Sequence, residues 1–408
     1  MSRYQHYFKL TAEEAADYVR ERVSFFSTGA VLESLEIGDG NINYVYRVLE
    51  PSTGRSLILK QSDPQVRSTG ENIGTHRSGL EASALKLQSG LAAGFVPEVY
   101  LYDSIMSCIA MEDLAGYENL RYTLNKHIIL ETLGEDITTF MAETLMRTCS
   151  LVMPPNQKRP LMQDFSNPHL CGITEQLVYT DPYTDHGKTN SLTEENRDFL
   201  EKALYQDTAL HKEVARLKNQ FLSNAQALLH GDLHTGSIFV KPGSTKVLDP
   251  EFACFGPIGY DVGNVIANLM FAWVNGWLTI EAPEEQKPYL QWLEATIADT
   301  LDLFLKKSRS ILRSAVTDSV FSTPDYLEDY LSEITSDIAS VAGLELNRRI
   351  IGFAKVKDIT MIEPMAKRVL AERICVTAGK KCILKEDFAF KAGADYVRLL
   401  QQTAVSSL

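Results

Sequence analysis

The sequence has 408 residues, 45% of them hydrophobic and 23% charged, which suits two or three packed units and excludes long disordered stretches. A formal net charge of −13, without any run rich in lysine and arginine, argues against nucleic acid as a partner. Six scattered cysteines without zinc spacing favour a reducing compartment, and an N-terminus without a signal-like apolar stretch makes export unlikely, so we expect a cytoplasmic protein.

The first part of the chain has the pattern of a small antiparallel sheet. Thr11, followed by two glutamates, predicts the N-cap of an opening helix. Strands are expected at 33–37, 43–49, 56–62, 96–103 and 105–111, with a helix at 78–89 before the last two. We therefore expect residues 1–114 to form one domain, an opening helix with a five-stranded sheet.

From about residue 115 the pattern becomes mostly helical, so residues 115–408 are expected to form a second, larger domain. The clearest helix is predicted at 211–228, with one apolar face made by Val214, Leu217, Phe221, Ala225 and Leu228. Strands at 237–240 and 246–249 are expected to form a hairpin. The predicted fold class is α+β, with a small sheet lobe followed by a larger helical lobe.

Residues 262–280 (VGNVIANLMFAWVNGWLTI) are mostly apolar, and the segment is about long enough to span a bilayer. Asn264, Asn268 and Asn275 favour a buried core helix instead, because amide groups in lipid have no water to bond. We therefore expect no membrane contact.

The strongest chemical signal is HGDLHTGS at 230–237, followed by VLDPE at 247–251. Phosphoryl transfer needs one carboxylate facing the acceptor hydroxyl and others on a metal ion. We expect Asp232 to orient the hydroxyl and accept its proton. Asp249 and Glu251, alternating across Pro250 in extended backbone, are expected to share Mg²⁺. Acidic turns at strand ends explain either motif alone, but explain their combination poorly.

One more carboxylate, Asp261, follows ten residues after Glu251. Asp261 stands at the start of the apolar segment, where capping the following helix is the favoured interpretation over a catalytic role.

Residues that could bind ATP occur in the predicted sheet. Gly38 and Gly40, with Asn43 after them, would let backbone amides approach phosphate oxygens, although a plain hairpin turn explains these glycines equally well. Lys60 is expected to be a phosphate ligand rather than a solvated strand end, because Glu81 on the next helix offers it a partner.

The predicted junction between the two lobes carries MEDL at 111–114. Backbone groups of Glu112, Asp113 and Leu114 are expected to bind the adenine edge, which does not depend on side-chain identity. This prediction rests on position alone.

Taken together, the motifs closely resemble those of the 5-methylthioribose kinases, part of the wider aminoglycoside phosphotransferase and choline kinase group. The likeness runs from about residue 30 to about residue 375, and its longest stretches are EIGDGNINY (36–44), ITEQLVYTDP (173–182) and DPEFACFGPIGYDVG (249–263). The resemblance implies a two-lobed, protein-kinase-like fold. It also implies a magnesium-dependent homodimer that uses ATP to phosphorylate S-methyl-5-thioribose on its 1-hydroxyl in methionine salvage.

Carried onto this chain, the resemblance assigns roles to single residues. Asn43 and Lys60 would contact ATP, and Asp232 would meet the sugar hydroxyl. Arg348 and Arg349 would stabilise charge on the transferring group, with Arg348 also touching the substrate. Without the resemblance, two adjacent arginines are more often a solvated helix face.

The chain also departs from the general kinase pattern. Ser237 stands where related kinases place a metal-binding asparagine, so we expect Glu251 to serve as the second metal ligand.

Two rival functions stay open at this point. One is phosphorylation of another small alcohol, such as an aminoglycoside, choline or homoserine, where a cationic substrate would want an acidic pocket. The other is a kinase-shaped binding module without activity. Such a module would normally have lost Lys60, Asp232 or Asp249, and this chain keeps all three.

Overall fold

The computed structural model describes residues 3–37, 43–65, 70, 72 and 74–407. These residues form two compact units. Unit 1 comprises Met1–Tyr117 with Lys246–Ala253, and unit 2 comprises Glu118–Thr245 with Cys254–Leu408. The division into domains at residues 114 and 115 stays a prediction. By its contacts, the segment that carries Asp249 and Glu251 lies in unit 1.

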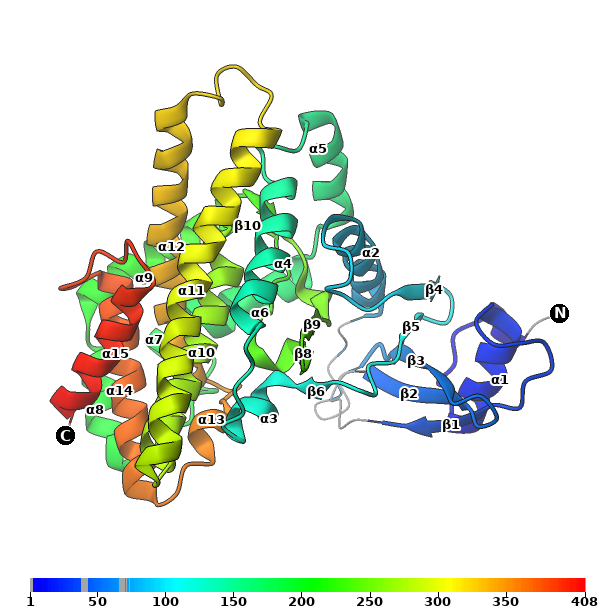
Figure 1. The fold of residues 1–408 in the computed structure, drawn as a ribbon, viewed down its shortest axis with the longest axis horizontal. Helices are drawn as coiled ribbons and strands as arrows, with labels where there is room; N and C mark the ends of the chain where they lie inside the picture. The colour runs from blue at the N-terminus through cyan, green and yellow to red at the C-terminus, as the bar shows by residue number, and fades with distance from the viewer. Residues whose placement is uncertain (1–2, 38–42, 66–69, 71, 73, 408) are drawn as a thin grey trace. The chain divides into compact units, whose positions relative to one another are not determined.

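Unit 1 is built around a five-stranded sheet, antiparallel throughout, in the order β1-β2-β3-β5-β4 (Figure 1). Its strands are β1 (Glu33–Glu36), β2 (Asn43–Glu50), β3 (Arg55–Ser62), β4 (Val99–Asp103) and β5 (Cys108–Glu112). All five predicted strands are present.

The last two strands start later than predicted, for local reasons. Before β4, the carbonyl groups of Phe95 and Val96 accept hydrogen bonds from Val247 N and Lys246 Nζ, at 2.7 and 3.2 Å. Before β5, the amides of Ile105 and Met106 donate to the Asp103 carboxylate, at 2.9 and 3.1 Å, and form a turn there.

Two helices complete unit 1, and both were predicted. Helix α1 (Ala12–Arg22) starts at Thr11, whose side chain accepts from Glu14 N while the Glu14 side chain accepts from Thr11 N. The helix lies against β1 and β2, and its buried residues share one hydrophobic core with residues of β2 and β3. Helix α2 (His76–Leu91) extends the predicted helix by two residues at each end. Short 3₁₀ turns lie at η1 (Arg3–Gln5) and η5 (Pro250–Phe252).

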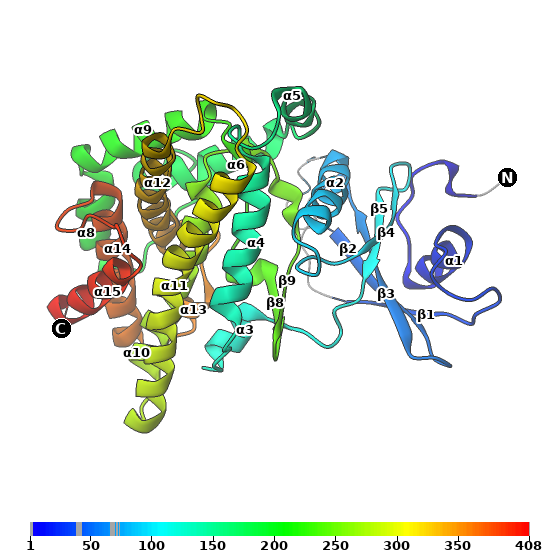
Figure 2. The same ribbon diagram turned by 45° about the horizontal axis from the view of Figure 1, so that its top comes forward.

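Unit 2 is mostly helical. Its helices are α3 (Leu120–Asn125), α4 (Leu133–Thr148), α5 (Pro155–Asp164), α6 (Pro168–Tyr179), α7 (Asp181–Thr184), α8 (Arg197–Leu200), α9 (Thr208–Ser223), α10 (Gly259–Thr279), α11 (Pro283–Ala315), α12 (Pro324–Ile351), α13 (Lys357–Thr360), α14 (Met365–Leu384) and α15 (Ala394–Ser407). Short turns are η2 (Glu194–Asn196), η3 (Glu201–Tyr205) and η4 (Thr235–Ser237). Figure 2 shows α4 lying alongside α11.

Short strands frame the HGDLHTGS motif. They are β6 (Glu118–Asn119), β7 (Ala227–Leu228), β8 (Ile238–Lys241), β9 (Ser244–Val247) and β10 (Phe255–Gly256). β8 and β9 form the predicted hairpin, with a tighter turn in which Gly243 has a φ of +73°.

The prediction that one helix spans 211–228 is wrong at its end. α9 stops at Ser223, and Leu228 lies in β7, buried and paired with Phe255 of β10. Tertiary partners replace the helical ones: Thr148 Oγ1 accepts from Leu228 N at 3.1 Å, and Lys158 Nζ donates to Ala225 O at 2.7 Å. The chain therefore leaves the helix before the HGDLHTGS motif.

The apolar segment 262–280 is a core helix, as predicted. α10 is buried from Gly259 to Gly276. A Cβ on Gly263 would lie 2.7 Å from Ile338 O, so the backbones of α10 and α12 approach closely there. Among the residues that the structure describes, no helix is both long and apolar enough to cross a membrane.

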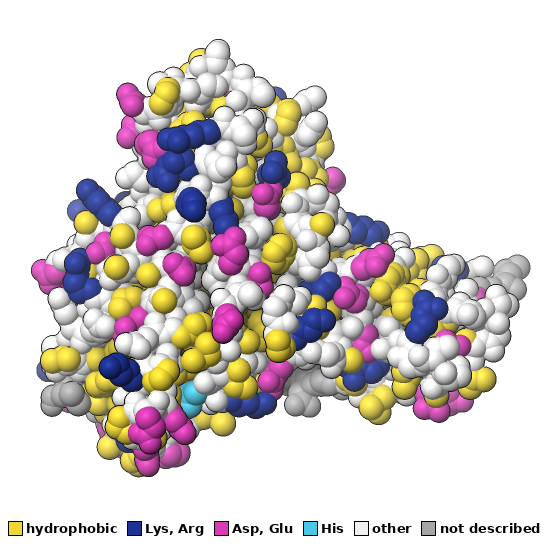
Figure 3. Space-filling view, viewed as in Figure 1, with side chains coloured by type: hydrophobic (Ala, Val, Ile, Leu, Met, Phe, Trp, Pro, Cys, Tyr) yellow, Lys and Arg dark blue, Asp and Glu magenta, His cyan; other side chains and the backbone are white. Residues whose placement is uncertain are grey.

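The fold class is α+β, with an antiparallel sheet unit and a larger helical unit, as predicted. On the face of unit 2 seen in Figure 3, basic and acidic side chains are interspersed and form no broad basic patch.

Candidate active site

The backbone of the Asp232 loop is held by Asp261. Gly231 has a φ of +84°, which favours glycine and turns the chain sharply before Asp232. In the first turn of α10, the Asp261 carboxylate accepts from His230 N at 2.7 Å and from Gly231 N at 3.0 Å. Burial raises the pKa of Asp261. Our prediction that Asp261 caps its own helix is therefore wrong, because its oxygens bind this loop.

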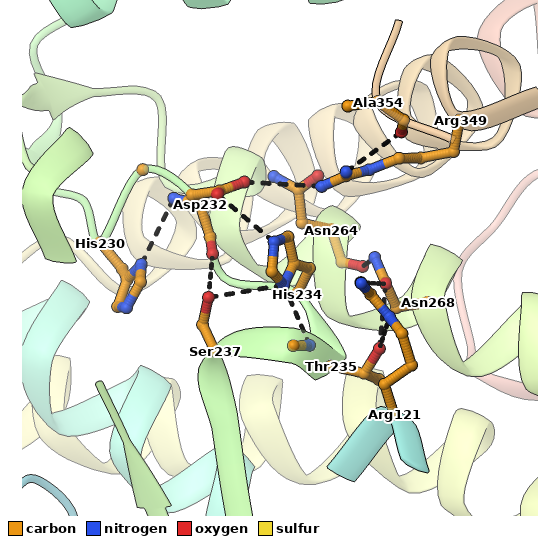
Figure 4. Close-up of polar contacts among 12 residues, drawn as sticks. Arg121, His230, Asp232, His234, Thr235, Ser237, Asn264, Asn268, Arg349 and Ala354 are labelled. Atoms are coloured by element: carbon orange, nitrogen blue, oxygen red, sulfur yellow. Dashed lines mark hydrogen bonds and ion pairs between the residues drawn. The ribbon is translucent and has the colours of Figure 1, made fainter. Parts of the chain in front are cut away.

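Asp232 lies among cationic and polar groups of unit 2 (Figure 4). Its Oδ1 is 3.7 Å from Arg348 Nη2 and 3.6 Å from Arg349 Nη2, and its Oδ2 is 3.3 Å from His234 Nε2. Burial alone would raise the pKa of Asp232, but His234, Arg349 and Arg348 outweigh it and hold that pKa far below its usual range. The carboxylate is therefore ionised, and because its side chain is 30% exposed, a ligand can reach it.

Glu345 fixes both guanidinium groups. It lies one turn before them on α12, where residues three and four apart share a face. Its Oε1 is 2.9 Å from Arg349 Nε, and its Oε2 bonds to Arg348 Nε. Although burial opposes ionisation, the two arginines lower the pKa of Glu345 to about 2. The arginine pair is therefore not a solvated helix face, because both guanidinium groups lie beside Asp232.

Asn268 of α10 connects the loop to α12. Its Nδ2 donates to Glu345 Oε1 at 3.1 Å, and its Oδ1 accepts from Thr235 Oγ1 at 3.2 Å. Arg121 of α3 also reaches this oxygen, at 3.5 Å (Figure 4). The loop, α10 and α12 are thus tied by one buried polar network.

Ser237 braces the same loop. Its Oγ donates to the backbone carbonyl of Asp232 at 3.0 Å. A serine at this position thus holds the backbone of the residue five positions earlier.

In unit 1, Lys60 forms the predicted pair with Glu81. Lys60 is 6% exposed, and its Nζ lies 2.8 Å from Glu81 Oε1 and 2.7 Å from Asp249 Oδ1. Burial would lower the pKa of Lys60, but the Asp249 and Glu81 carboxylates outweigh it and raise that pKa. The ammonium is therefore charged and fixed at a defined place.

The backbone at Asp249 is not extended, so that part of our prediction is wrong. Asp249 has a left-handed φ of 63°, and Pro250–Phe252 form a 3₁₀ turn. Glu251 Oε2 lies 3.3 Å from Arg77 Nε, a residue that the sequence did not single out. Arg77 Nη2 also donates to Asn43 Oδ1 at 3.0 Å, so Arg77 connects two of the predicted ligand residues.

The carboxylates of this turn suit a cation shared with phosphates. Among the described residues, no group of three or more His, Cys, Asp or Glu side chains could hold a metal ion. Mg²⁺ commonly takes one or two carboxylates and completes its shell with substrate phosphates and water. Asp249 and Glu251 provide two such ligands, and the Asp249 side chain is 43% exposed. The donor set therefore fits Mg²⁺ that arrives with a nucleotide.

The predicted adenine-binding stretch uses its side chains for structure. Glu112 pairs with Lys246 at 2.6 Å, and Asp113 pairs with Arg47 at 2.8 Å. Glu112 N donates to Glu98 O, and Leu114 O accepts from Tyr117 N, both at 2.8 Å. Any ligand bound here would meet other backbone groups of 112–114.

Gly38 and Gly40, which we predicted to contact phosphates, lie outside the described residues. Asn43, at the start of β2, is described, and its Oδ1 accepts from Ser62 Oγ at 3.0 Å.

Comparison with known proteins gives concordant results. Residues 34–294 match the phosphotransferase enzyme family. The methylthioribose kinase of Geobacillus kaustophilus is 38% identical over 384 residues, which cover 94% of each chain. The methylthioribose kinase of Cronobacter sakazakii is 33% identical over 389 residues, or 94% of this chain and 95% of that one. A crystal structure of choline kinase from Cryptosporidium parvum shares 12% identity and a TM-score of 0.47, covering 97% and 94% of the two chains. That last likeness carries no weight in choosing an acceptor.

Proposed function

Because the chain belongs to the methylthioribose kinases of the phosphotransferase enzyme family, we propose that it transfers the γ-phosphoryl group of ATP to the 1-hydroxyl of S-methyl-5-thioribose. The product is S-methyl-5-thioribose 1-phosphate, an intermediate of methionine salvage. We also propose that the enzyme is cytoplasmic, which its scattered cysteines favour, and a homodimer, which rests on the family resemblance alone.

One observation supports a neutral acceptor above all others. Two guanidinium groups lie 3.6 and 3.7 Å from the carboxylate that meets the acceptor. A choline or aminoglycoside cation at Asp232 would face both Arg348 and Arg349 and would be repelled. A neutral thiosugar meets no such penalty.

In this proposal, Asp232 orients the 1-hydroxyl for attack. Its lowered pKa makes it a weak base, which suits a loose transition state in which the hydroxyl proton leaves late. Arg348 and Arg349 stabilise negative charge on the transferring group and its acceptor oxygen.

The nucleotide is assigned to residues of unit 1. Lys60 is assigned to phosphate oxygens, and so are Asn43, Gly38 and Gly40. Adenine is assigned to the backbone of 112–114, where the Glu112 carbonyl and the Leu114 amide have the acceptor and donor character that its edge requires.

Mg²⁺ is assigned to Asp249 and Glu251, and when bound it neutralises charge on the phosphates. Within the protein, Lys60 holds Asp249 and Arg77 holds Glu251, so both carboxylates are already oriented. Glu81, engaged by Lys60, positions that lysine and is not assigned to the metal.

A coupled ADP-release assay tests the acceptor. Purified protein with Mg²⁺ and ATP is offered methylthioribose, choline, homoserine and an aminoglycoside in parallel. We expect methylthioribose to give by far the highest kcat/KM. A preference for either cationic alcohol would contradict the proposal, and no ADP release with any acceptor would favour a binding module without activity.

A further inference from the structure

The His234 ring lies beside Asp232 and is held there by contacts on both sides (Figure 4). Its Nδ1 accepts from Gly236 N at 3.0 Å, and its Nε2 lies 3.3 Å from Asp232 Oδ2. A Cβ on Gly236 would lie only 2.7 Å from His234 Cε1, so glycine leaves the room that the ring needs. The imidazole is therefore held at both of its nitrogen atoms.

These two partners determine where the proton sits, because the third contact of the ring, Ser237 Oγ at 3.4 Å from Nδ1, is longer than the 3.0 Å bond from Gly236 N. A backbone N–H can only donate, so His234 Nδ1 must offer its lone pair to Gly236. An ionised carboxylate can only accept, so Nε2 must carry the hydrogen that faces Asp232. In the other neutral tautomer, the Nδ1–H would face the N–H of Gly236, and the lone pair of Nε2 would face the Asp232 carboxylate. The imidazolium would point a second N–H at that of Gly236.

The surrounding charges favour the same state. Asp232 and Glu345 attract a proton to the ring, whereas Arg349 of α12 and Arg121 of α3 repel one. Burial is the largest influence and lowers the pKa of His234. The ring is therefore neutral near neutral pH, and Arg348 and Arg349 are the charged groups that keep Asp232 ionised there.

We propose that His234 is a positioning residue whose neutral imidazole, protonated on Nε2, holds Oδ2 of Asp232 and so fixes the plane of the carboxylate that orients the acceptor hydroxyl. This inference rests on the proposed function. With His234 at Oδ2 and the arginines near Oδ1, the carboxylate has one orientation instead of rotating about its Cβ–Cγ bond.

Matched amide variants separate this role from simple packing. The amide nitrogen of His234→Gln can reach the place of Nε2, whereas that of His234→Asn ends near Nδ1 and cannot reach Asp232. We expect His234→Asn and His234→Ala to lose kcat by about 30-fold with little change in KM for ATP, and His234→Gln to regain most of it. The exposed His169→Gln serves as control, and thermal unfolding of every variant checks folding.

The proton position is read directly from the unmodified protein. Nitrogen-15 NMR of histidine-labelled enzyme, assigned by the signal missing from His234→Gln, should show the Nε2–H tautomer near neutral pH. The kcat of the wild type should also stay level as pH falls from about 8 to about 6.5, since the working form is neutral.

The contrary outcomes are distinct. An Nδ1–H tautomer or an imidazolium near neutral pH, or His234→Asn as active as His234→Gln, would overturn the inference. If the wild type released no ADP with methylthioribose, the proposed function would fail instead, and the NMR result would still decide the state of the ring.

Discussion

At the level of single residues, the proposed function depends on two side chains of opposite charge, one assigned to the nucleotide and one to the acceptor. Lys60 is a cation held by Glu81 and Asp249, and Asp232 is an anion held beside Arg348 and Arg349. Each centre is ionised because its partners outweigh the cost of burial. Removing one partner therefore changes more than one contact.

Glu251→Gln tests the assignment of the second metal ligand. An amide keeps the size of the side chain but is a weaker ligand for a hard cation, so we expect kcat to fall by about 100-fold and the Mg²⁺ concentration for half-maximal rate to rise. KM for ATP should change little. Rates measured over a Mg²⁺ titration check this, with the exposed Glu33→Gln as control. An unchanged Mg²⁺ dependence would remove Glu251 from the metal site.

Glu345→Gln tests how the ionised Glu345 beside the two arginines affects the stability of the protein at different pH values. The pKa of Glu345 is about 2 in the folded protein, below its ordinary value of 4.5, so its ionised form stabilises the fold above about pH 4.5. That contribution, about 3 kcal/mol, is lost as pH falls toward 2. Urea unfolding should show the wild type losing its advantage over Glu345→Gln on acidification. A difference that stays constant with pH would contradict this.

The residues that the sequence revealed and those it did not differ in a physical respect. Asp232, Lys60 and Glu81 occur in local patterns that state their chemistry: a loop motif, a strand end and the helix after it. Arg77 and Asn268 act through contacts that join distant segments, such as Arg77 with Glu251. No local spacing predicts such pairs.

At the level of elements, the sequence predicted those helices and strands whose position depends on residues close together in the chain. Alternation gave the strands, and Thr11 gave the start of α1, because capping involves neighbours in sequence. The end of α9 and the turn at Asp249 were missed, because strand pairing by Leu228 and a left-handed φ are set by tertiary contacts.

The close crossing of α10 and α12 leads to a prediction at this scale. A Cβ on Gly263 would lie 2.7 Å from Ile338 O and 2.9 Å from Ala342 N, where backbone must shift. We expect Gly263→Ala to destabilise the protein by about 1–3 kcal/mol in urea unfolding.

The matched control is Gly172→Ala on α6, where an added Cβ meets nothing within 4 Å. That change should be neutral or stabilising by up to about 1 kcal/mol, since alanine favours a helix over glycine. Equal effects of the two substitutions would show that the crossing is not tightly packed at Gly263.

At the level of the whole molecule, the chain returns to unit 1 after it has completed the Asp232 loop in unit 2. Residues 246–253 join that unit through Lys246 with Glu112 at 2.6 Å and Lys60 with Asp249 at 2.7 Å. A cut between residues 114 and 115 would therefore separate Lys60 from Asp249. The residues that we assign to the nucleotide are therefore discontinuous in sequence.

The position of the new phosphate is the central claim of this account. Phosphorus NMR of the product formed from ATP and methylthioribose should show one new ester resonance coupled to the anomeric proton, as expected for S-methyl-5-thioribose 1-phosphate. A phosphate on another hydroxyl, or inorganic phosphate alone, would contradict the assignment of the acceptor.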